Sequence, residues 1–188
     1  MLNAWHLKLA ARALAGGGLV MHATEGVWGL ACDPFNAQAV SRLLDLKGRS
    51  VEKGLIVIGS APDDFSPELA AIESGQRQSV LDSWPAAETW ILPNRQFPFW
   101  ITGTHTGVAV RIPGHSQARA LAAAFGGPLV STSANPSGLP APTSALKARG
   151  IFHRGTFPGW TDYILPGEVL LPGSPSRIRT LAGEALRG

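Results

Sequence analysis

Three cationic residues crowd one short stretch of the sequence, and they are the first residues whose types and spacing could do chemistry. Lys47, Arg49 and Lys53 fall within seven residues of one another. Like charges this close repel unless an anion lies between them or water solvates them. One interpretation is a phosphate cradle, with Arg49 as a planar fork and the lysines as mobile point charges. The other is a helix C-terminal cap followed by a solvated loop. The segment alone leaves both open.

A second candidate is the polar stretch Ser131–Gly138, which reads Ser-Thr-Ser-Ala-Asn-Pro-Ser-Gly. It follows an apolar run, at the point where α/β proteins commonly place ligands. Its hydroxyl and amide groups could donate and accept hydrogen bonds to such a ligand. The same residue types also form ordinary capped turns, and taken alone this stretch favours a turn.

A third candidate is the segment His22–Leu30, which joins two predicted strands and contains two glycines, Gly26 and Gly29. These glycines could admit close approach of a ligand, or simply relieve a tight turn. Farther along, Arg111 ends another predicted strand. A buried arginine needs an anionic partner, which is either a ligand or an Asp or Glu of the protein.

Several kinds of site are not supported by the sequence. It has neither a Walker-type loop nor a G-x-G-x-x-G fingerprint, and no G-x-S-x-G elbow. Cys32 is the only cysteine, so thiolate zinc clusters and intrachain disulfides are excluded. A chain that cannot form an intrachain disulfide is typical of the reducing cytoplasm. The five histidines, including His153, are scattered without metal-ligand spacing. We therefore expect no protein-held metal and no covalent nucleophile.

The elements that would position these residues alternate between strands and helices. Predicted strands cover residues 18–23, 27–32, 55–58, 89–92, 108–112, 129–132, 163–165 and 177–181. Predicted helices cover residues 1–12, a stretch capped by Asn36, one starting at Ser66-Pro67, and residues 76–83, 116–125 and 143–149. This alternation predicts a layered α/β domain with one mixed sheet.

The bulk properties narrow the function only mildly. A length of 188 residues suits one domain, and 45% hydrophobic residues is typical of a globular protein. A net charge of +3 and a pI near 9.5 are compatible with a nucleotide or tRNA as ligand. No apolar run approaches the roughly 20 residues that cross a bilayer, so we expect no membrane association. The start, Met1–Arg12, is predicted to be an amphipathic helix rather than a signal peptide.

These segments, in this order, resemble the YrdC-domain family, the threonylcarbamoyl-AMP synthases, and more closely its short single-domain bacterial form. The matching stretches are residues 24–34, 44–49, 53–56, 108–113, 128–138 and 175–179, and the resemblance runs from about Leu14 to Leu181. It implies a single YrdC-like domain over residues 1–188. That domain would have a twisted mixed sheet flanked by helices and a concave ligand cavity.

The resemblance implies a nucleotidyltransferase. It would form L-threonylcarbamoyladenylate and pyrophosphate from L-threonine, bicarbonate or CO2 and ATP, for the t6A37 modification of tRNA. Mg²⁺ would be held mainly by the ATP phosphates, and other t6A-pathway proteins, tRNA or double-stranded RNA are implied partners. By this resemblance the catalytic residues are Lys47, Arg49 and Lys53; ATP is bound by Lys47, Arg49, Ser131, Ser133, Asn135, Ser176 and Arg179; and threonine is bound by Thr24, Lys53 and Arg111.

The sequence departs from the family pattern at four places. His22 stands where the family often has tyrosine, Ala23 where it has proline, and Thr180 where it has aspartate. Residues 84–89 read Trp-Pro-Ala-Ala-Glu-Thr instead of W-P-G-P-x-T. None of these changes removes a proposed catalytic residue.

Two alternatives to the synthase remain. One is a non-catalytic module that binds tRNA or double-stranded RNA, although the widely spaced tryptophans offer no stacking platform. The other is carbamoyl transfer, as in hydrogenase-maturation proteins that contain a YrdC domain. Those chains are much longer and carry zinc-finger segments, so the present length argues against it.

Overall fold

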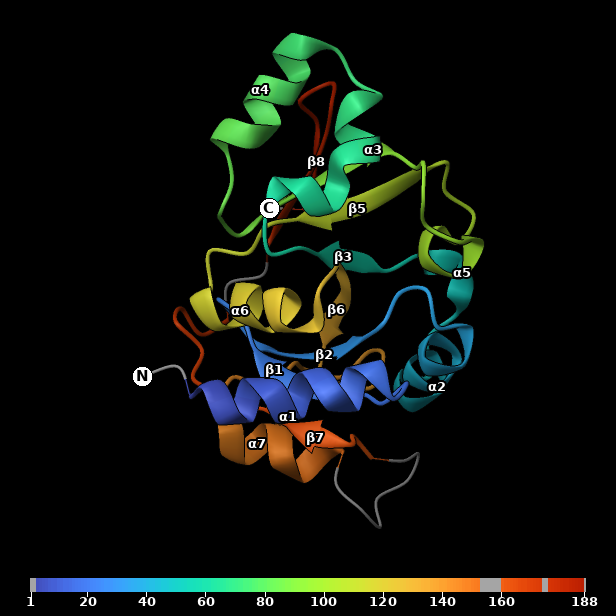
Figure 1. Ribbon diagram of the computed structural model, residues 1–188. Coiled ribbons are helices and arrows are strands. Elements are labelled where there is room, and N and C mark those ends of the chain that lie inside the picture. Colours follow the sequence, from blue (N-terminus) through green and yellow to red (C-terminus); the bar gives the residue numbers. More distant parts are fainter. Residues whose placement is uncertain (1–2, 153–159, 174–175, 188) are drawn as a thin grey trace.

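The computed structural model describes residues 3–152, 160–173 and 176–187, so His153, Pro175 and the first two residues of the predicted N-terminal helix lie outside the described residues (Figure 1). The helices are α1 (Ala4–Ala15), α2 (Ala37–Lys47), α3 (Ser66–Ala70), α4 (Ser74–Asp82), α5 (Phe99–Thr102), α6 (Ser116–Phe125) and α7 (Ala145–Ile151), with 3-10 turns η1 (Val51–Lys53) and η2 (Pro62–Phe65). Within these ranges no helix has the length and apolar character needed to cross a bilayer.

The strands form one sheet, which confirms the predicted mixed α/β class. They are β1 (Val20–Ala23), β2 (Trp28–Cys32), β3 (Ile56–Ile58), β4 (Glu88–Pro93), β5 (Gly107–Arg111), β6 (Leu129–Ser133), β7 (Tyr163–Ile164), β8 (Arg177–Thr180) and β9 (Ala185–Arg187). Their order is β7-β1-β2-β6-β3-β5-β4-β8-β9. The pairs β1–β7, β3–β5 and β4–β8 are parallel, and the others are antiparallel.

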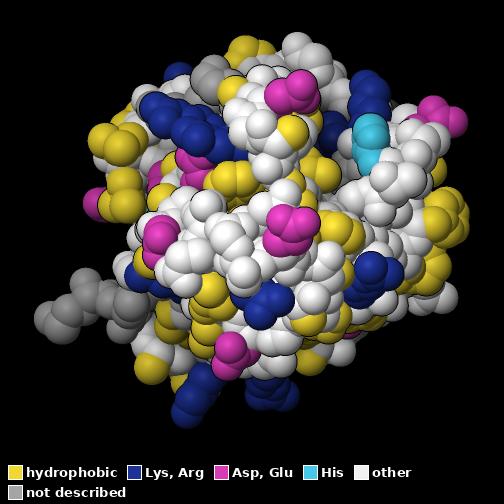
Figure 2. All heavy atoms as spheres, turned by 90° about the horizontal axis from the view of Figure 1, so that it is seen from above, with side chains coloured by type: hydrophobic (Ala, Val, Ile, Leu, Met, Phe, Trp, Pro, Cys, Tyr) yellow, Lys and Arg dark blue, Asp and Glu magenta, His cyan; other side chains and the backbone are white. Residues whose placement is uncertain are grey.

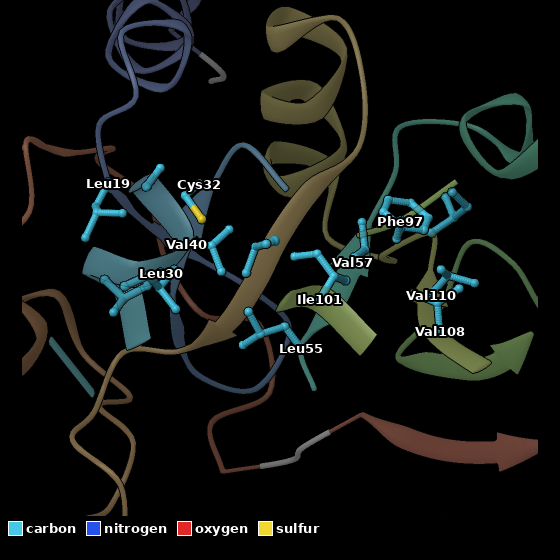
Figure 3. Close-up of a cluster of buried hydrophobic side chains, with 14 of the residues drawn as sticks. Leu19, Leu30, Cys32, Val40, Leu55, Val57, Phe97, Ile101, Val108 and Val110 are labelled. Carbon is cyan, nitrogen blue, oxygen red and sulfur yellow. The ribbon is translucent and has the colours of Figure 1, made fainter. Parts of the chain in front are cut away.

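One face of the sheet is packed with buried side chains from β1 across to β4. Alternate strand residues such as Leu30, Val57 and Val110 are fully buried there (Figure 3). Helices α2, α3, α4 and α5 contribute to the same cluster, for example through Leu43 of α2 and Ile101 of α5. Because side chains alternate between the two faces of a strand, the remaining strand residues point to the opposite face.

The opposite face is covered only in part. Val20, Ile58 and Leu129 pack there against Leu14 of α1 and Leu121 of α6. Figure 1 shows these two helices lying across the β1, β2 and β6 part of the sheet. Toward β5, β4 and β8 the same face lines a cavity. We call this face of the sheet the cavity face.

Helix boundaries follow from local chemistry. Asn36 accepts a hydrogen bond from the Ala39 amide at 3.0 Å and caps α2, as the sequence predicts. Gly48 ends α2 in the left-handed conformation that glycine adopts without steric cost. This end places Lys47 and the cations after it beside the sheet.

Most predicted elements are present, with shifted ends. The first helix spans Ala4–Ala15 rather than residues 1–12, and the last spans Ala145–Ile151 rather than residues 143–149. The sequence prediction missed α5 and β9. Helix α5 has only four residues, too few for a helical period to be visible. The strand β9 contains alanine and arginine, which have little strand preference.

Candidate active site

A cavity of about 770 Å³ opens on the cavity face. The elements that reach it include the β1–β2 connection with Gly29 of β2, the η1 segment, α5 and the loop after it, strands β3 to β6, and strands β8 and β9. Seven of the predicted site residues line it, namely Thr24, Arg49, Lys53, Arg111, Ser131, Ser133 and Ser176. The structure therefore brings together residues that are up to about 150 positions apart in the sequence.

Arg49 and Lys53 supply positive charge at one wall. The guanidinium of Arg49 is half-buried, and its Nη2 donates to the Gly54 carbonyl at 2.9 Å. Lys53 is exposed at the same wall, on η1. One cation is thus anchored and the other is free to move toward a ligand. This combination suits a multiply charged anion.

Lys47 and Asn135 lie beside the cavity without lining it. The buried Lys47 ammonium donates to the carbonyls of Ser133 and Asn135, the latter at 2.7 Å. Burial, and then the charge of Arg49, lower the pKa of Lys47 from 10.5 to about 8. The Asn135 amide donates to the carbonyls of Pro136 and Leu139. Both side chains therefore shape the loop that presents Ser133.

Arg111 has a partner within the protein. Its Nη1 lies 3.4 Å from Oε2 of Glu25, and both residues are buried. Oε1 of Glu25 accepts from the Gly114 amide at 2.7 Å and from the His115 amide at 3.4 Å. Of the two partners predicted for Arg111, a protein carboxylate is therefore present. The pair still lines the cavity, so the guanidinium can also face a ligand.

The hydroxyl groups come from three different strands or their ends. Ser131 and Ser133 stand on β6, two residues apart and thus on the same face. Thr24 donates to the Val27 carbonyl at 2.7 Å, which holds the β1–β2 turn. Ser176, just before β8, is buried and accepts from Thr89 at 3.2 Å.

Arg179 does not reach the cavity. In the register of β8 with β4 it pairs with Trp90, whose side chain belongs to the packed face. Ile178 next to it belongs to the cavity wall. Arg179 instead forms an ion pair with Glu88. The alternation of side chains along a strand thus separates it from its neighbours Ile178 and Ser176.

Two parts of the site were missed by the sequence analysis. Glu25 lies within the segment His22–Leu30 and has no predicted role, although the need of Arg111 for an anionic partner was the available signal. The apolar wall, made by residues such as Ile91, Ala109 and Ile178, was also missed. These residues are ordinary strand residues, and only the register shows which of them face the cavity.

The site contains no activated thiol. Cys32 is buried on the packed face, and burial raises the pKa of its thiol, so the nucleophilic thiolate is disfavoured. Among the residues that the structure describes, no three His, Cys, Asp or Glu side chains gather in a metal-binding group. The arrangement offers cations, hydroxyls and an apolar wall. These groups can bind and orient an anionic ligand with an apolar part.

A mixed sheet with a cationic, hydroxyl-lined cavity defines a ligand-binding α/β domain, and the comparisons with known proteins give its family. The family model described as "Telomere recombination" (Sua5, YciO, YrdC) matches residues 12–187. A protein of Xanthomonas euvesicatoria named threonylcarbamoyl-AMP synthase is 44% identical over 191 residues, covering 100% of both chains. The protein of that name from Pseudomonas fluorescens is 39% identical over 183 residues, covering 97% of this chain and 96% of its own.

Solved structures agree with this family. Sua5 of P. abyssi in complex with L-threonine superposes with a TM-score of 0.87 at 30% identity, covering 98% of this chain and 54% of that one. The chain thus spans about half the length of that relative. E. coli YciO has a TM-score of 0.80 at 17% identity, with 97% and 90% covered, and supports the fold alone. The chain therefore belongs to the Sua5/YciO/YrdC family.

Proposed function

We propose that this chain is an L-threonylcarbamoyladenylate synthase, a nucleotidyltransferase that uses L-threonine, bicarbonate or CO2 and ATP. One observation carries the proposal. Arg49, Lys53 and Arg111 converge on a single cavity together with the hydroxyls of Ser131 and Ser133. The relatives that match the whole chain are named threonylcarbamoyl-AMP synthase, and a solved relative holds L-threonine.

The chemistry fits a site without a nucleophile. The amine of threonine takes up CO2 and loses a proton, which gives a carbamate. A carbamate oxygen then attacks the α-phosphorus of ATP, and the bond to the β-phosphate oxygen breaks, which releases pyrophosphate. Such a step depends on positioning and on neutralising charge. Arg49 and Lys53 would face the phosphates, and Arg111 and Thr24 would face the amino acid.

The remaining predicted residues have three different places in the proposal. Lys47 and Asn135 would act by holding the loop that presents Ser133, because their side chains contact its backbone. Ser176 would contact the nucleotide from the end of β8. Arg179 is left outside the proposed site because its side chain lies on the packed face.

In the proposed reaction, Mg²⁺ would enter the site bound to ATP. The carboxylate at the cavity is Glu25, whose oxygens already face Arg111 and the Gly114 amide. The protein therefore offers the ion no ready carboxylate of its own among the cavity residues described. The ion would be held by phosphate oxygens and water, and it would neutralise phosphate charge.

The setting of the reaction follows from the same proposal. Residues 1–188 would act as a single YrdC-like domain in the cytoplasm, and the product would enter the t6A37 modification of tRNA with other proteins of that pathway.

Direct RNA binding is less well supported. On the face drawn in Figure 2, the Lys and Arg side chains form separate groups among hydrophobic and other polar atoms rather than one basic stripe.

The deciding experiment is mass spectrometry of the products. The chain is incubated with ATP, Mg²⁺, bicarbonate and L-threonine, and omission of threonine is the control. We expect threonylcarbamoyl-AMP and one equivalent of pyrophosphate only in the complete mixture. Absence of the adduct under conditions in which a known synthase forms it would reject the function.

A further inference from the structure

His22 is a fully buried histidine beside the cavity that the proposed chemistry does not use. It stands on β1 and pairs with Gly29 of β2, and Ser131 stands on β6, the next strand. Its Nε2 lies 3.4 Å from the Oγ of Ser131, so the ring reaches across β2.

Gly29 makes this crossing possible. A Cβ at position 29 would lie only 3.3 Å from Nε2 of His22 and 3.2 Å from the Thr132 carbonyl oxygen. Both contacts are tighter than ordinary van der Waals contact. The absence of a side chain at this position therefore leaves the space through which the imidazole approaches Ser131.

The hydrogen bonds fix where the protons are. Nδ1 of His22 lies 3.1 Å from the Ala23 carbonyl oxygen. A carbonyl oxygen can only accept, so Nδ1 carries the proton and donates it. In a neutral imidazole Nε2 is then an acceptor, and the hydroxyl of Ser131 must be the donor.

The ring is neutral at physiological pH. Burial, with smaller contributions from His115 and Arg111, lowers the pKa of His22 to about 4, even though the hydrogen bond to the Ala23 carbonyl opposes this shift. The protonated form, which would donate from both nitrogens, is therefore not the one that Ser131 meets at pH 7.

We propose that His22 is a positioning residue: its Nε2 accepts a hydrogen bond from the Ser131 hydroxyl, so that Ser131 presents only lone pairs to the cavity. Ser131 then binds a donor of the ligand, an amine N–H or a hydroxyl O–H, and not a phosphate or carboxylate oxygen. This inference rests on the proposed function for the identity of the ligands, L-threonine and ATP. It assigns Ser131 to a donor group and leaves the anionic groups to the cations.

The proton positions can be tested without any ligand. Imidazole ¹⁵N NMR of the ligand-free protein at pH 7 distinguishes protonated from unprotonated nitrogens, and the His22→Asn variant identifies the His22 signals by their loss. We expect a proton on Nδ1, a bare Nε2, and a shift of the Nε2 signal in Ser131→Ala. A proton on Nε2, or on both nitrogens, overturns the proposal. This result does not depend on whether the protein is a synthase.

The role of His22 in ligand binding is tested with two substitutions whose side chains differ in length. His22→Asn keeps a donor near the Ala23 carbonyl but places no acceptor at the Nε2 position, whereas His22→Gln can place its carbonyl oxygen there. Dissociation constants for L-threonine and for ATP are measured by calorimetry, and melting curves verify folding. We expect His22→Asn to weaken one ligand about 5- to 10-fold, the range of one neutral hydrogen bond, and His22→Gln to restore most of it. The ligand that weakens identifies the donor as the amino acid or the ribose.

A double substitution separates positioning from general damage. In the Ser131→Ala background, His22→Asn should change neither dissociation constant further, because its partner is absent. Equal weakening with and without Ser131 overturns the proposal, as does unchanged binding in His22→Asn. If the unaltered protein binds neither ligand, the proposed function fails instead, and the NMR measurement still decides the state of His22.

Discussion

The cations of the cavity differ in how they are held, and this difference sets what each substitution should do. Arg49 is anchored by the Gly54 carbonyl, whereas Lys53 is exposed on η1. Arg111 faces a protein carboxylate. An anchored guanidinium is already in place when the ligand arrives, so its contribution requires little ordering. Arg49 is therefore the side chain whose loss should be felt most in the reaction.

We expect Arg49→Ala to lower threonine-dependent pyrophosphate release by at least about 100-fold, as for loss of one preorganised charge-stabilising group. Its stability should fall by less than about 1 kcal/mol, because the side chain is partly exposed. A coupled pyrophosphate assay and urea unfolding measure the two effects. Arg42→Ala is the matched control, since Arg42 forms a surface ion pair with Asp162 and does not line the cavity. Near-normal release by Arg49→Ala would contradict the cationic site.

Lys47 makes a prediction about stability and pH. Its pKa is about 8 in the folded protein, against 10.5 for an unburied lysine such as that of the unfolded chain. Between these two pH values the unfolded chain therefore binds a proton that the folded chain has released. Stability therefore rises with pH across this window, by up to about 3 kcal/mol, and this gain is absent below pH 8. Urea unfolding at pH 7.5 and pH 10 should show a smaller rise in Lys47→Met than in the unaltered protein. An equal rise in both proteins would show that Lys47 is not the source.

At the scale of elements, two short helical segments, η1 and α5, form part of the cavity wall. The η1 turn that carries Lys53 is held against α5, where the Thr104 amide donates to the Glu52 carbonyl at 3.3 Å. Gly103, which ends α5, has a φ of 60°, and a Cβ there would lie 2.4 Å from the Glu52 carbonyl oxygen. Because that neighbour is backbone, the clash cannot be relieved by a rotamer change.

Gly103→Ala should therefore destabilise the fold by at least about 2 kcal/mol, through the clash and the left-handed backbone. It should also weaken ATP binding by displacing η1. Gly75→Ala is the control: Gly75 lies within α4, has no atom within 4 Å of the added Cβ, and should gain about 0.5–1 kcal/mol of stability. Chemical unfolding of the two variants measures both values. If Gly103→Ala were as stable as Gly75→Ala, the close packing of α5 on η1 would not hold.

The elements were largely predictable from the sequence, whereas their partners were not. The capping residue Asn36 and the helix start at Ser66-Pro67 have local signals and are confirmed. The cavity depends on which strands become neighbours, and β6 pairs with β2 and β3, far from it in the sequence. Local patterns contain no such information. The cation segment and the polar segment are therefore each ambiguous on their own, and no local pattern gives Glu25 a role.

The roles of Lys47 and Arg179 show the same limit at single residues. A lysine at a helix C-terminus is typical of an exposed cap, yet Lys47 is 3% exposed and donates to carbonyls of another loop. Arg179 is one position away from a cavity residue, and the strand register turns it to the other face. Both outcomes depend on tertiary packing, which acts after the local preferences.

At the scale of the whole molecule, ligands should stabilise the folded state. A ligand present at 100 times its dissociation constant adds about 2.7 kcal/mol to the free energy of unfolding. We expect ATP with Mg²⁺ and L-threonine to raise the melting temperature together more than either alone. Double-stranded RNA should have little effect. Thermal melting with each addition checks this, with Arg49→Ala as the variant in which the shift from ATP should shrink. A shift caused by RNA alone would favour the RNA-binding alternative.

The two faces of the sheet have a consequence for how this protein could change. Along β4 and β5, neighbouring residues serve different purposes: Trp90 and Val110 fill the packed face, whereas Ile91 and Ala109 line the cavity. Substitutions at the second set alter the shape offered to a ligand and leave the packed layer intact. The residues that determine which substrate fits therefore alternate along each strand with the residues that stabilise the fold. Variant libraries restricted to Ile91, Ala109 and Ile178 are where altered selectivity should arise with the fewest unfolded members.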